Sequence, residues 1–409
     1  MRLVFVADGR SPTARNWVSG FADAGFEVHL ISTTPSDWQI PLASLHMVSV
    51  AYSGLAKPLK PGAVQPQSRG LLSGARAMNL RASARKWIGP CLLKTPAEKI
   101  RCIVEEIQPD LVHAMRIPFE GMVTAQAGFS QPLLVSVWGN DFTLHASATP
   151  GMRKRTRETL QRCDGLHADC RRDLVLARQW GWRDGAPEIV LPGNGGIKPD
   201  IFYPRPDTEK ISPGLAAVLD NIPRGTNLVV NPRGFRGYLR NDTFFRSIPL
   251  ILAQKPETLF LCPAMAGEPQ AQMWLDRLNI HNAVRLLPRL SPEEMAQLFS
   301  MSHIAVSPSE HDGTPNTLLE SMACGAFPIA GDIDSIREWI TDGENGLLID
   351  PADPVQLADA VLRALRDFNF RGGVVEKNQA EVTAHAAQPD VFRRAVAFYE
   401  QIISRSHVE

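Results

Sequence analysis

Long apolar runs, metal-ligand cysteine pairs and internal repeats are all missing from this chain of 409 residues. No run of about 18 apolar residues occurs, so the sequence predicts no membrane-spanning helix. The six cysteines follow no metal-ligand spacing, and nothing else is typical of a secreted disulfide scaffold. No catalytic triad, carboxylate dyad or zinc cluster can be recognised in the sequence. We therefore expect a globular protein with reduced thiols and no metal.

Acidic residues are also missing from one long segment, because none occurs between Gln39 and Ala97. The same segment holds eight cations among scattered apolar residues: Lys57, Lys60, Arg69, Arg76, Arg81, Arg85, Lys86 and Lys94. A basic amphipathic element of this kind suits an anionic membrane surface or an anionic acceptor. The alternative is a solvated insertion whose apolar residues pack inward. No nucleic-acid motif accompanies the charge, so we expect no nucleic-acid partner.

Charge and pattern divide the chain into two halves. Residues 1–196 hold 23 Lys and Arg against 16 Asp and Glu, whereas the remainder holds 20 against 27. Short apolar runs alternate with helical patterns in both halves, which predicts parallel sheets wrapped by helices. The runs are Leu3–Val6, Val28–Ile31, Leu111–His113, Leu133–Val137 and Ile189–Leu191, then Leu228–Val230, Leu259–Leu261, Val284–Leu287, Ile304–Val306 and Phe327–Ala330. Glycine and proline cluster between Pro192 and Pro206, where we place the joint.

The stretch from Ser307 to Gly325 is the most informative part of the sequence. The apolar run Ile304–Val306 ends in Ser-Pro-Ser, and Gly313 and Pro315 exclude regular structure between that run and Asn316. From Asn316 onward, apolar residues recur at helical spacing until Gly325. The segment therefore predicts a strand, a loop and a helix.

The start of this predicted helix is suited to a diphosphate. The first amides of a helix lack internal partners and carry the positive end of its dipole, so they attract anions. Glu320 lies one turn further on, where a carboxylate can accept two hydrogen bonds from a ribose diol, and Asp312 lies in the preceding loop. The alternative is an ordinary strand-loop-helix with Asn316 as N-cap and Glu320 as a surface acid.

These residues carry a family resemblance. The string from Asp312-Gly313-Thr314-Pro315-Asn316 to Glu320 and Gly325 resembles the donor-site signature of retaining glycosyltransferases of family 4, the glycosyltransferases group 1. The family signature usually begins with Glu, where this chain has Asp312. The likeness continues through Phe327–Asp332, Arg337–Ile340 and Asp342–Ile349, which match a strand, a helix and a Gly-rich hairpin of the family. It implies an α/β GT-B fold, with two doubly wound Rossmann-like domains facing a central cleft.

The resemblance also assigns residues to the site. In the loop 231–240, Arg233 matches the family's diphosphate arginine, and Arg236 or Arg240 can substitute for its lysine. Trp138 stands where the family has a histidine that contacts the transferred sugar, so Asp141 becomes the nearest ionisable candidate, with His113 and His145 as outsiders. For His113 the alternative is a histidine satisfied at a strand end. The implied donor-binding residues are Gly9, Arg233, Arg236, Asp312, Gly313, Thr314, Pro315, Asn316, Thr317 and Glu320, and the implied catalytic residues are Asp141, Arg233, Arg236 and Asp312.

The implied domain organisation has three parts. Residues 1–196 form an acceptor-binding domain, in which the loop at Gly9 follows the first strand and Asn16–Val18 open the next helix. Residues 197–390 form the nucleotide-sugar domain. A helix over 391–409 can pack back on the first domain. The implied function is transfer of a sugar from a nucleoside diphosphate to a glycan, lipid-linked or small-molecule acceptor, without metal or cofactor. A non-catalytic sugar-nucleotide-binding subunit and a GT-B epimerase or phosphorylase are the alternatives. The expected location is the cytoplasm, with peripheral contact to the inner face of the membrane as an option.

Overall fold

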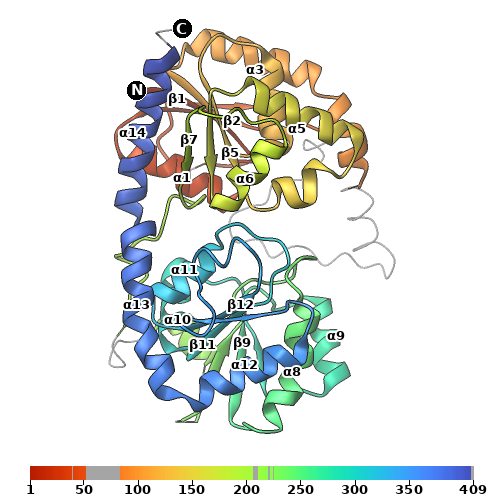
Figure 1. Cartoon of the computed structure of the whole chain (residues 1–409), viewed down its shortest axis with the longest axis vertical. Helices are drawn as coiled ribbons and strands as arrows, with labels where there is room; N and C mark the ends of the chain where they lie inside the picture. Colours follow the sequence, from red (N-terminus) through yellow and green to blue (C-terminus); the bar gives the residue numbers. More distant parts are fainter. Residues whose placement is uncertain (39, 52–82, 206–210, 220–221, 224, 407–409) are drawn as a thin grey trace. The chain divides into compact units, whose positions relative to one another are not determined.

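A computed structural model describes the chain except residues 39, 52–82, 206–210, 220–221, 224 and 407–409 (Figure 1). The chain forms two compact units. The first, here the N-terminal unit, comprises Met1–Gly195 and Val391–Glu409. The second, here the C-terminal unit, comprises Gly196–Asp390. None of the helices in the described part of the chain combines the length and hydropathy needed to cross a bilayer.

The N-terminal unit is built on a seven-stranded parallel sheet with the order β3-β2-β1-β4-β5-β6-β7. Its strands are β1 (Arg2–Ala7), β2 (Glu27–Ser32), β3 (Ser44–Met47), β4 (Leu111–Ala114), β5 (Leu133–Val137), β6 (Gly165–Ala168) and β7 (Glu188–Val190). Its helices are α1 (Pro12–Asp23), α3 (Lys94–Ile107), α4 (Met122–Ala127), α5 (Pro150–Arg162), α6 (Arg171–Gln179) and, from Val391 onward, α14 (Gln388–Ser406). Helical turns over Ile117–Gly121 and Asp141–Ala146 follow β4 and β5.

Alternation along these strands fills both faces of the sheet, because successive side chains in a strand point to opposite sides. In β1, Val4 and Val6 belong to the core beneath α3, α4 and α5, whereas Leu3 and Phe5 belong to the core beneath α1 and α14. Tyr399 of α14 is fully buried there. The C-terminal helix is therefore part of the N-terminal unit's core.

The C-terminal unit has a six-stranded parallel sheet with the order β10-β9-β8-β11-β12-β13. Its strands are β8 (Asn227–Val230), β9 (Thr258–Cys262), β10 (Val284–Leu286), β11 (Ile304–Ser307), β12 (Phe327–Gly331) and β13 (Leu347–Ile349). Its helices are α7 (Pro213–Val218), α8 (Asn241–Leu252), α9 (Pro269–Leu278), α10 (Pro292–Met301), α11 (Asn316–Ala323), α12 (Pro354–Arg366) and α13 (Phe368–Ala386). Two apolar clusters cover the two faces of this sheet.

The predicted α/β class with two parallel, doubly wound sheets is confirmed, but several local predictions are wrong. Residues 334–339 form turns rather than the helix expected over Arg337–Ile340, and Leu347–Ile349 pairs parallel with β12 instead of closing a hairpin. Helix α1 begins at Pro12, where Ser11 accepts from the Ala14 amide, and not at Asn16. A serine followed by proline is a strong helix start that precedes the apolar pattern.

Part of the basic element falls outside the described residues, namely Lys57, Lys60, Arg69, Arg76 and Arg81. Of the rest, residues 83–88 are helical and Lys94 begins α3. The apolar residues here do not all pack inward: Leu93 is fully buried, whereas Trp87 is 64% exposed and Ile88 45% exposed.

Candidate functional site

The order of the strands in the C-terminal unit defines one natural ligand position. From β8 the chain moves outward to β9 and β10, and it then returns to β11 on the other side of β8 before moving to β12 and β13. In open α/β sheets, ligands bind beyond the carboxyl ends of the strands at such a reversal. The loops at this position are 231–240 after β8 and 308–315 after β11. These are the two loops in which the sequence predicts donor-site residues.

An ion pair joins the two loops. Nη1 of Arg233 lies 2.7 Å from Oδ2 of Asp312, and Nη2 lies 3.3 Å from Oδ1. Only 12% and 13% of the two side chains are exposed. Burial alone would lower the pKa of Arg233, but the attraction of Asp312 outweighs it and the pKa is raised. Arg233 therefore stays charged, and Asp312 fixes its position by a two-point contact.

The other two arginines of the first loop differ in how their charge is balanced. Arg240 donates to Asp242 and to Glu310, so two carboxylates compensate it. Arg236 is exposed, and its one described contact donates to the Tyr238 hydroxyl at 3.2 Å. No acid pairs with Arg236 in the described parts of the chain. Of the two substitutes for the family lysine, the structure leaves Arg236 available to an anion.

Helix α11 begins with unpaired donors. Its N-cap is Pro315, which has no side chain to cap the helix, and Asn316 is the first helical residue and not the N-cap. The Leu318 and Leu319 amides donate to the Pro315 carbonyl, but the amides of Asn316 and Thr317 have no acceptor among the described residues. The buried Oγ1 of Thr317 is also without a partner there. These groups offer hydrogen bonds to an anion.

The loop before α11 is held by two side chains that sequence reasoning missed. The Trp339 indole donates to Oγ1 of Thr314 at 3.1 Å, and the Ser335 hydroxyl donates to the Asp312 carbonyl at 2.7 Å. Both come from the turns after β12, so only the fold brings them here. Thr314 and Asp312 are thereby positioned without any ligand.

Glu320 lies in the second turn of α11 and is half-buried. Burial raises the pKa of its carboxyl to about 7, although Arg233 acts to lower it. Its carboxyl oxygens make no hydrogen bond or ion pair within the described residues. A half-buried acid with no partner is costly, and a ligand with two hydroxyl donors would satisfy it. The interpretation of Glu320 as an ordinary surface acid therefore does not fit.

The predicted residues of the first half lie in the N-terminal unit. The Asp141 carboxylate is fully buried and accepts from Arg116 at 2.6 Å and from the amides of Ile117 and Trp138. It therefore organises the loops after β4 and β5. A Cβ at Gly9 would collide with the Ser36 hydroxyl, so close packing within the unit already requires glycine.

His113 is a core residue, as its alternative interpretation states. Its ring nitrogens bond to the Tyr399 hydroxyl at 2.6 Å and to the Ser136 hydroxyl at 2.8 Å. Burial holds the pKa of His113 well below its usual value. The Tyr399 hydroxyl also accepts from the Trp17 indole at 2.9 Å, so α1, β4 and α14 share one buried network.

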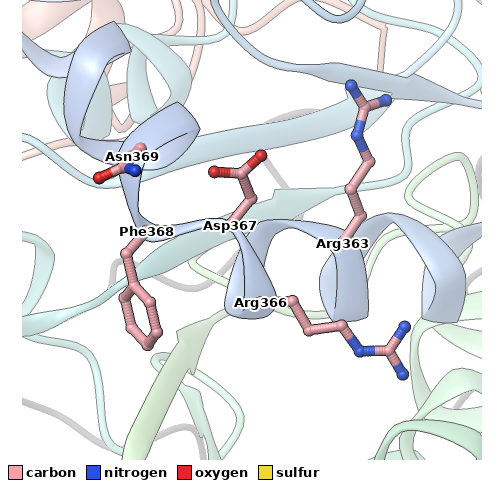
Figure 2. A pocket seen from close by; sticks show the side chains of 5 residues that line it. All are labelled: Arg363, Arg366, Asp367, Phe368 and Asn369. Carbon is pink, nitrogen blue, oxygen red and sulfur yellow. The ribbon is translucent and has the colours of Figure 1, made fainter.

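Two other groups of side chains in the described residues are weaker candidates for a ligand site. Ligand atoms of Asp169, Cys170 and Asp173 lie within 4.8 Å of one another, but Arg172 pairs with Asp173 at 2.7 Å and supplies positive charge. A surface pocket of about 560 Å³ at the junction of α12 and α13 is lined by Arg363, Arg366, Asp367, Phe368 and Asn369. Its side chains diverge, with Arg363 and Asp367 on one side of the ribbon and Arg366 and Phe368 on the other (Figure 2). Neither cluster combines a buried ion pair with free helix donors as the loops after β8 and β11 do.

Comparison with known proteins bears on the family and the fold. Residues 235–367 match the family described as Glycosyl transferases group 1, so one third of the chain, including α11, carries the match. The structure also resembles sucrose-phosphate synthase from Thermosynechococcus elongatus, with a TM-score of 0.73, 16% identity and coverage of 99% of this chain and 100% of that one. For Anabaena HepE in complex with UDP, the TM-score is 0.71, the identity 13% and the coverage 98% and 100%. The fold is GT-B, made of two Rossmann-like units.

Curated relatives share part of their length with this chain. The D-inositol 3-phosphate glycosyltransferase of Corynebacterium urealyticum is 26% identical over 43% of this chain and 45% of its own length. That of Thermobispora bispora is 26% identical over 54% of this chain and 52% of its own length. The chain thus spans about half the length of the curated relatives that it matches.

Proposed function

We propose that this protein is a retaining glycosyltransferase that takes its sugar from a nucleoside diphosphate. The observation that carries the proposal is the half-buried carboxyl of Glu320, which has no partner among the described residues, together with the free amides at the start of α11 and the charge of Arg233 that acts on Glu320. Arg236, on the same loop as Arg233, is the second cation. A carboxylate for a ribose diol, backbone donors for phosphate oxygens and guanidinium groups for diphosphate charge together match a nucleoside diphosphate. HepE has been solved with UDP and UDP-glucose, so uridine is the first base to test.

The proposed reaction needs no strong base from the protein. The bond between the sugar C1 and the diphosphate oxygen breaks, and a bond from C1 to the acceptor oxygen forms on the same face of the sugar. The acceptor hydroxyl gives its proton to the departing phosphate oxygen, which balances the exchange. Arg233, Arg236 and the α11 amides stabilise the charge that develops on the leaving diphosphate. Asp312 acts as a positioning residue, because it holds Arg233 in place.

The acceptor can be a glycan, a lipid-linked molecule or a small molecule, and the proposed reaction uses neither metal nor cofactor. All six cysteines are free thiols, which suits a reducing compartment, so the cytoplasm is the proposed location. Contact with an anionic membrane surface is an additional proposal that rests on the basic element around Arg85 and Lys86.

Calorimetry with UDP, GDP, ADP and their sugar conjugates tests the proposal. We expect one preferred nucleotide, with affinity reduced by about 1.5–3 kcal/mol in Glu320→Gln, the scale of lost charge-assisted hydrogen bonds. Glu376→Gln is the matched control, since Glu376 is exposed on α13. No binding of any nucleotide, or equal binding by Glu320→Gln, would overturn the site. Binding without any sugar transfer across an acceptor panel would overturn the enzymatic activity.

A further inference from the structure

A second basic cluster lies at the carboxyl ends of β1, β4 and β5, inside the N-terminal unit. This position is the strand reversal of the sheet, because the chain runs outward from β1 to β2 and β3 and later returns to β4 on the other side of β1. Arg10 follows β1 and Arg116 follows β4, while Arg85 comes from the helical residues 83–88. The reversal of an open sheet is the position where ligands bind.

The three arginines differ in how they are paired. Arg10 makes three hydrogen bonds to Asp8. Arg116 pairs with Asp141 and also donates to the Asn140 side chain. Arg85 makes no hydrogen bond or ion pair within the described residues, and its guanidinium lies 4.2 Å from the centre of the Phe119 ring. A half-buried cation without hydrogen bonds is costly, so Arg85 is the arginine of the three that a bound anion would stabilise most.

Trp138 and His145, which follow β5, extend the cluster. Four of its nitrogen atoms are buried and have no partner among the described residues: Nε of Arg85, Nε of Arg116, Nε1 of Trp138 and Nδ1 of His145. The Arg116 guanidinium lies 5.4 Å from the centre of the Trp138 ring. Burial, with the charges of Arg116, Lys86 and Arg85, lowers the pKa of His145 to about 3. Buried polar nitrogens in native proteins are nearly always satisfied, and Arg85, Arg116 and His145 lie close enough for their charges to interact, so their unsatisfied nitrogens indicate a missing ligand.

The acids nearby do not neutralise the positive charge of Arg85. Asp8 and Asp141 are committed to Arg10 and Arg116. Glu120 is buried and accepts from the Thr33 hydroxyl at 2.8 Å. Burial raises the pKa of Glu120, which favours its neutral form despite Arg116 and Arg85. Arg85 and the neighbouring Lys86 thus leave the cluster with positive charge.

The backbone also holds this arrangement at a cost. Phe119 has a φ of +69°, a left-handed conformation that an aromatic residue rarely adopts. Its ring is the surface on which the Arg85 guanidinium rests. Strain of this kind persists where the surroundings require it, and it concentrates at ligand sites.

We propose that this cluster, formed by Arg85, Arg116, Trp138 and His145, binds a phosphate ester carried by the acceptor. Donors that arrive from three separate segments suit a tetrahedral group with several oxygens better than a planar carboxylate. Arg85 is half-buried, and no hydrogen bond within the described residues occupies its guanidinium, so the group can receive a ligand. That the phosphate belongs to the acceptor rests on the proposed function, whereas the phosphate site itself does not.

Calorimetry with inorganic phosphate, glycerol 3-phosphate and glucose 6-phosphate, against glycerol and glucose, tests the site. We expect binding of a phosphorylated probe only, weakened about tenfold or more in Arg85→Met, which keeps the stem over Phe119. Trp138→Phe removes one donor and should weaken binding several-fold. Arg153→Met, which removes an exposed cation of α5, is the control for charge and should have no effect.

Vesicles of phosphatidic acid against phosphatidylcholine distinguish a lipid phosphate from a soluble one. Binding to phosphatidic acid that depends on Arg85, without binding of soluble esters, would support the site and assign it a lipid source. No binding of any phosphate probe, or equal weakening by Arg153→Met, would overturn it. Affinity for the preferred nucleotide should stay unchanged in Arg85→Met and fall in Glu320→Gln, so failure of this site and failure of the donor site are separate results.

Discussion

The raised pKa of Glu320 makes the stability of the C-terminal unit depend on pH. Its carboxyl has an ordinary value of 4.5 and a folded value of about 7, because burial disfavours the charged form. Between these values the folded protein holds a proton that the unfolded chain has lost. The stabilisation is therefore complete below about pH 4.5 and disappears as the pH rises through 7.

Glu320→Gln should remove this dependence. One pKa unit corresponds to about 1.36 kcal/mol, so a shift from 4.5 to about 7 sets an upper limit of about 3 kcal/mol. Since part of the side chain still reaches solvent, we expect about 1–3 kcal/mol. Relative to wild type, the Glu320→Gln protein should gain this free energy of unfolding between pH 5 and pH 8.

The measurement is denaturant unfolding at pH 5, 6, 7 and 8, read by hydrogen exchange in peptides from α11 so that the C-terminal unit is followed separately. Glu376→Gln should keep the pH dependence of wild type. In parallel, wild-type nucleotide affinity should rise as the pH passes 7, because the carboxylate is the form that accepts from a diol. An identical pH dependence in wild type and Glu320→Gln would refute the assignment of this titration to Glu320.

Two further predictions concern side-chain contacts within each unit. Asp312→Asn should destabilise the protein by about 1–3 kcal/mol in chemical denaturation and lower the rate of sugar transfer, because it removes the charge that positions the buried Arg233; unchanged turnover would contradict the positioning role. Tyr399→Phe should cost about 1–3 kcal/mol of unfolding free energy, because its hydroxyl serves two buried partners. Tyr203→Phe, at a side chain that is 38% exposed, should cost much less, and equal losses would argue against the buried network.

Much of the fold could be predicted because its strands are continuous apolar runs. The missed strands are those with a weaker pattern: β6 reads Gly-Leu-His-Ala, and β3 at the sheet edge alternates between half-buried and exposed residues. The helix expected over Arg337–Ile340 came from the family resemblance, and residues 334–339 form successive turns in its place. Such errors concern local conformation, which the packing of neighbouring elements decides.

The candidate donor site was predictable as a set of residue types but not as a geometry. Arg233 and Asp312 are 79 positions apart, and nothing local indicates that they pair. The same holds for Trp339 and Ser335, whose side chains reach back to the loop before α11. Asp141 accepts from three donors of its own unit, and its place near the transferred sugar stays a prediction.

By itself, the sequence determined the alternation of strands and helices, the loop that ends in α11, and the presence of Glu320 one turn into that helix. These are local properties, because they depend on periodicity, on proline and glycine, and on the spacing of neighbours. Only the tertiary structure decided that β8 and β11 are adjacent, that Asp312 holds Arg233, and that Glu320 is half-buried with a pKa of about 7. These depend on burial and on contacts between distant segments, so they exist only once the sheet has formed.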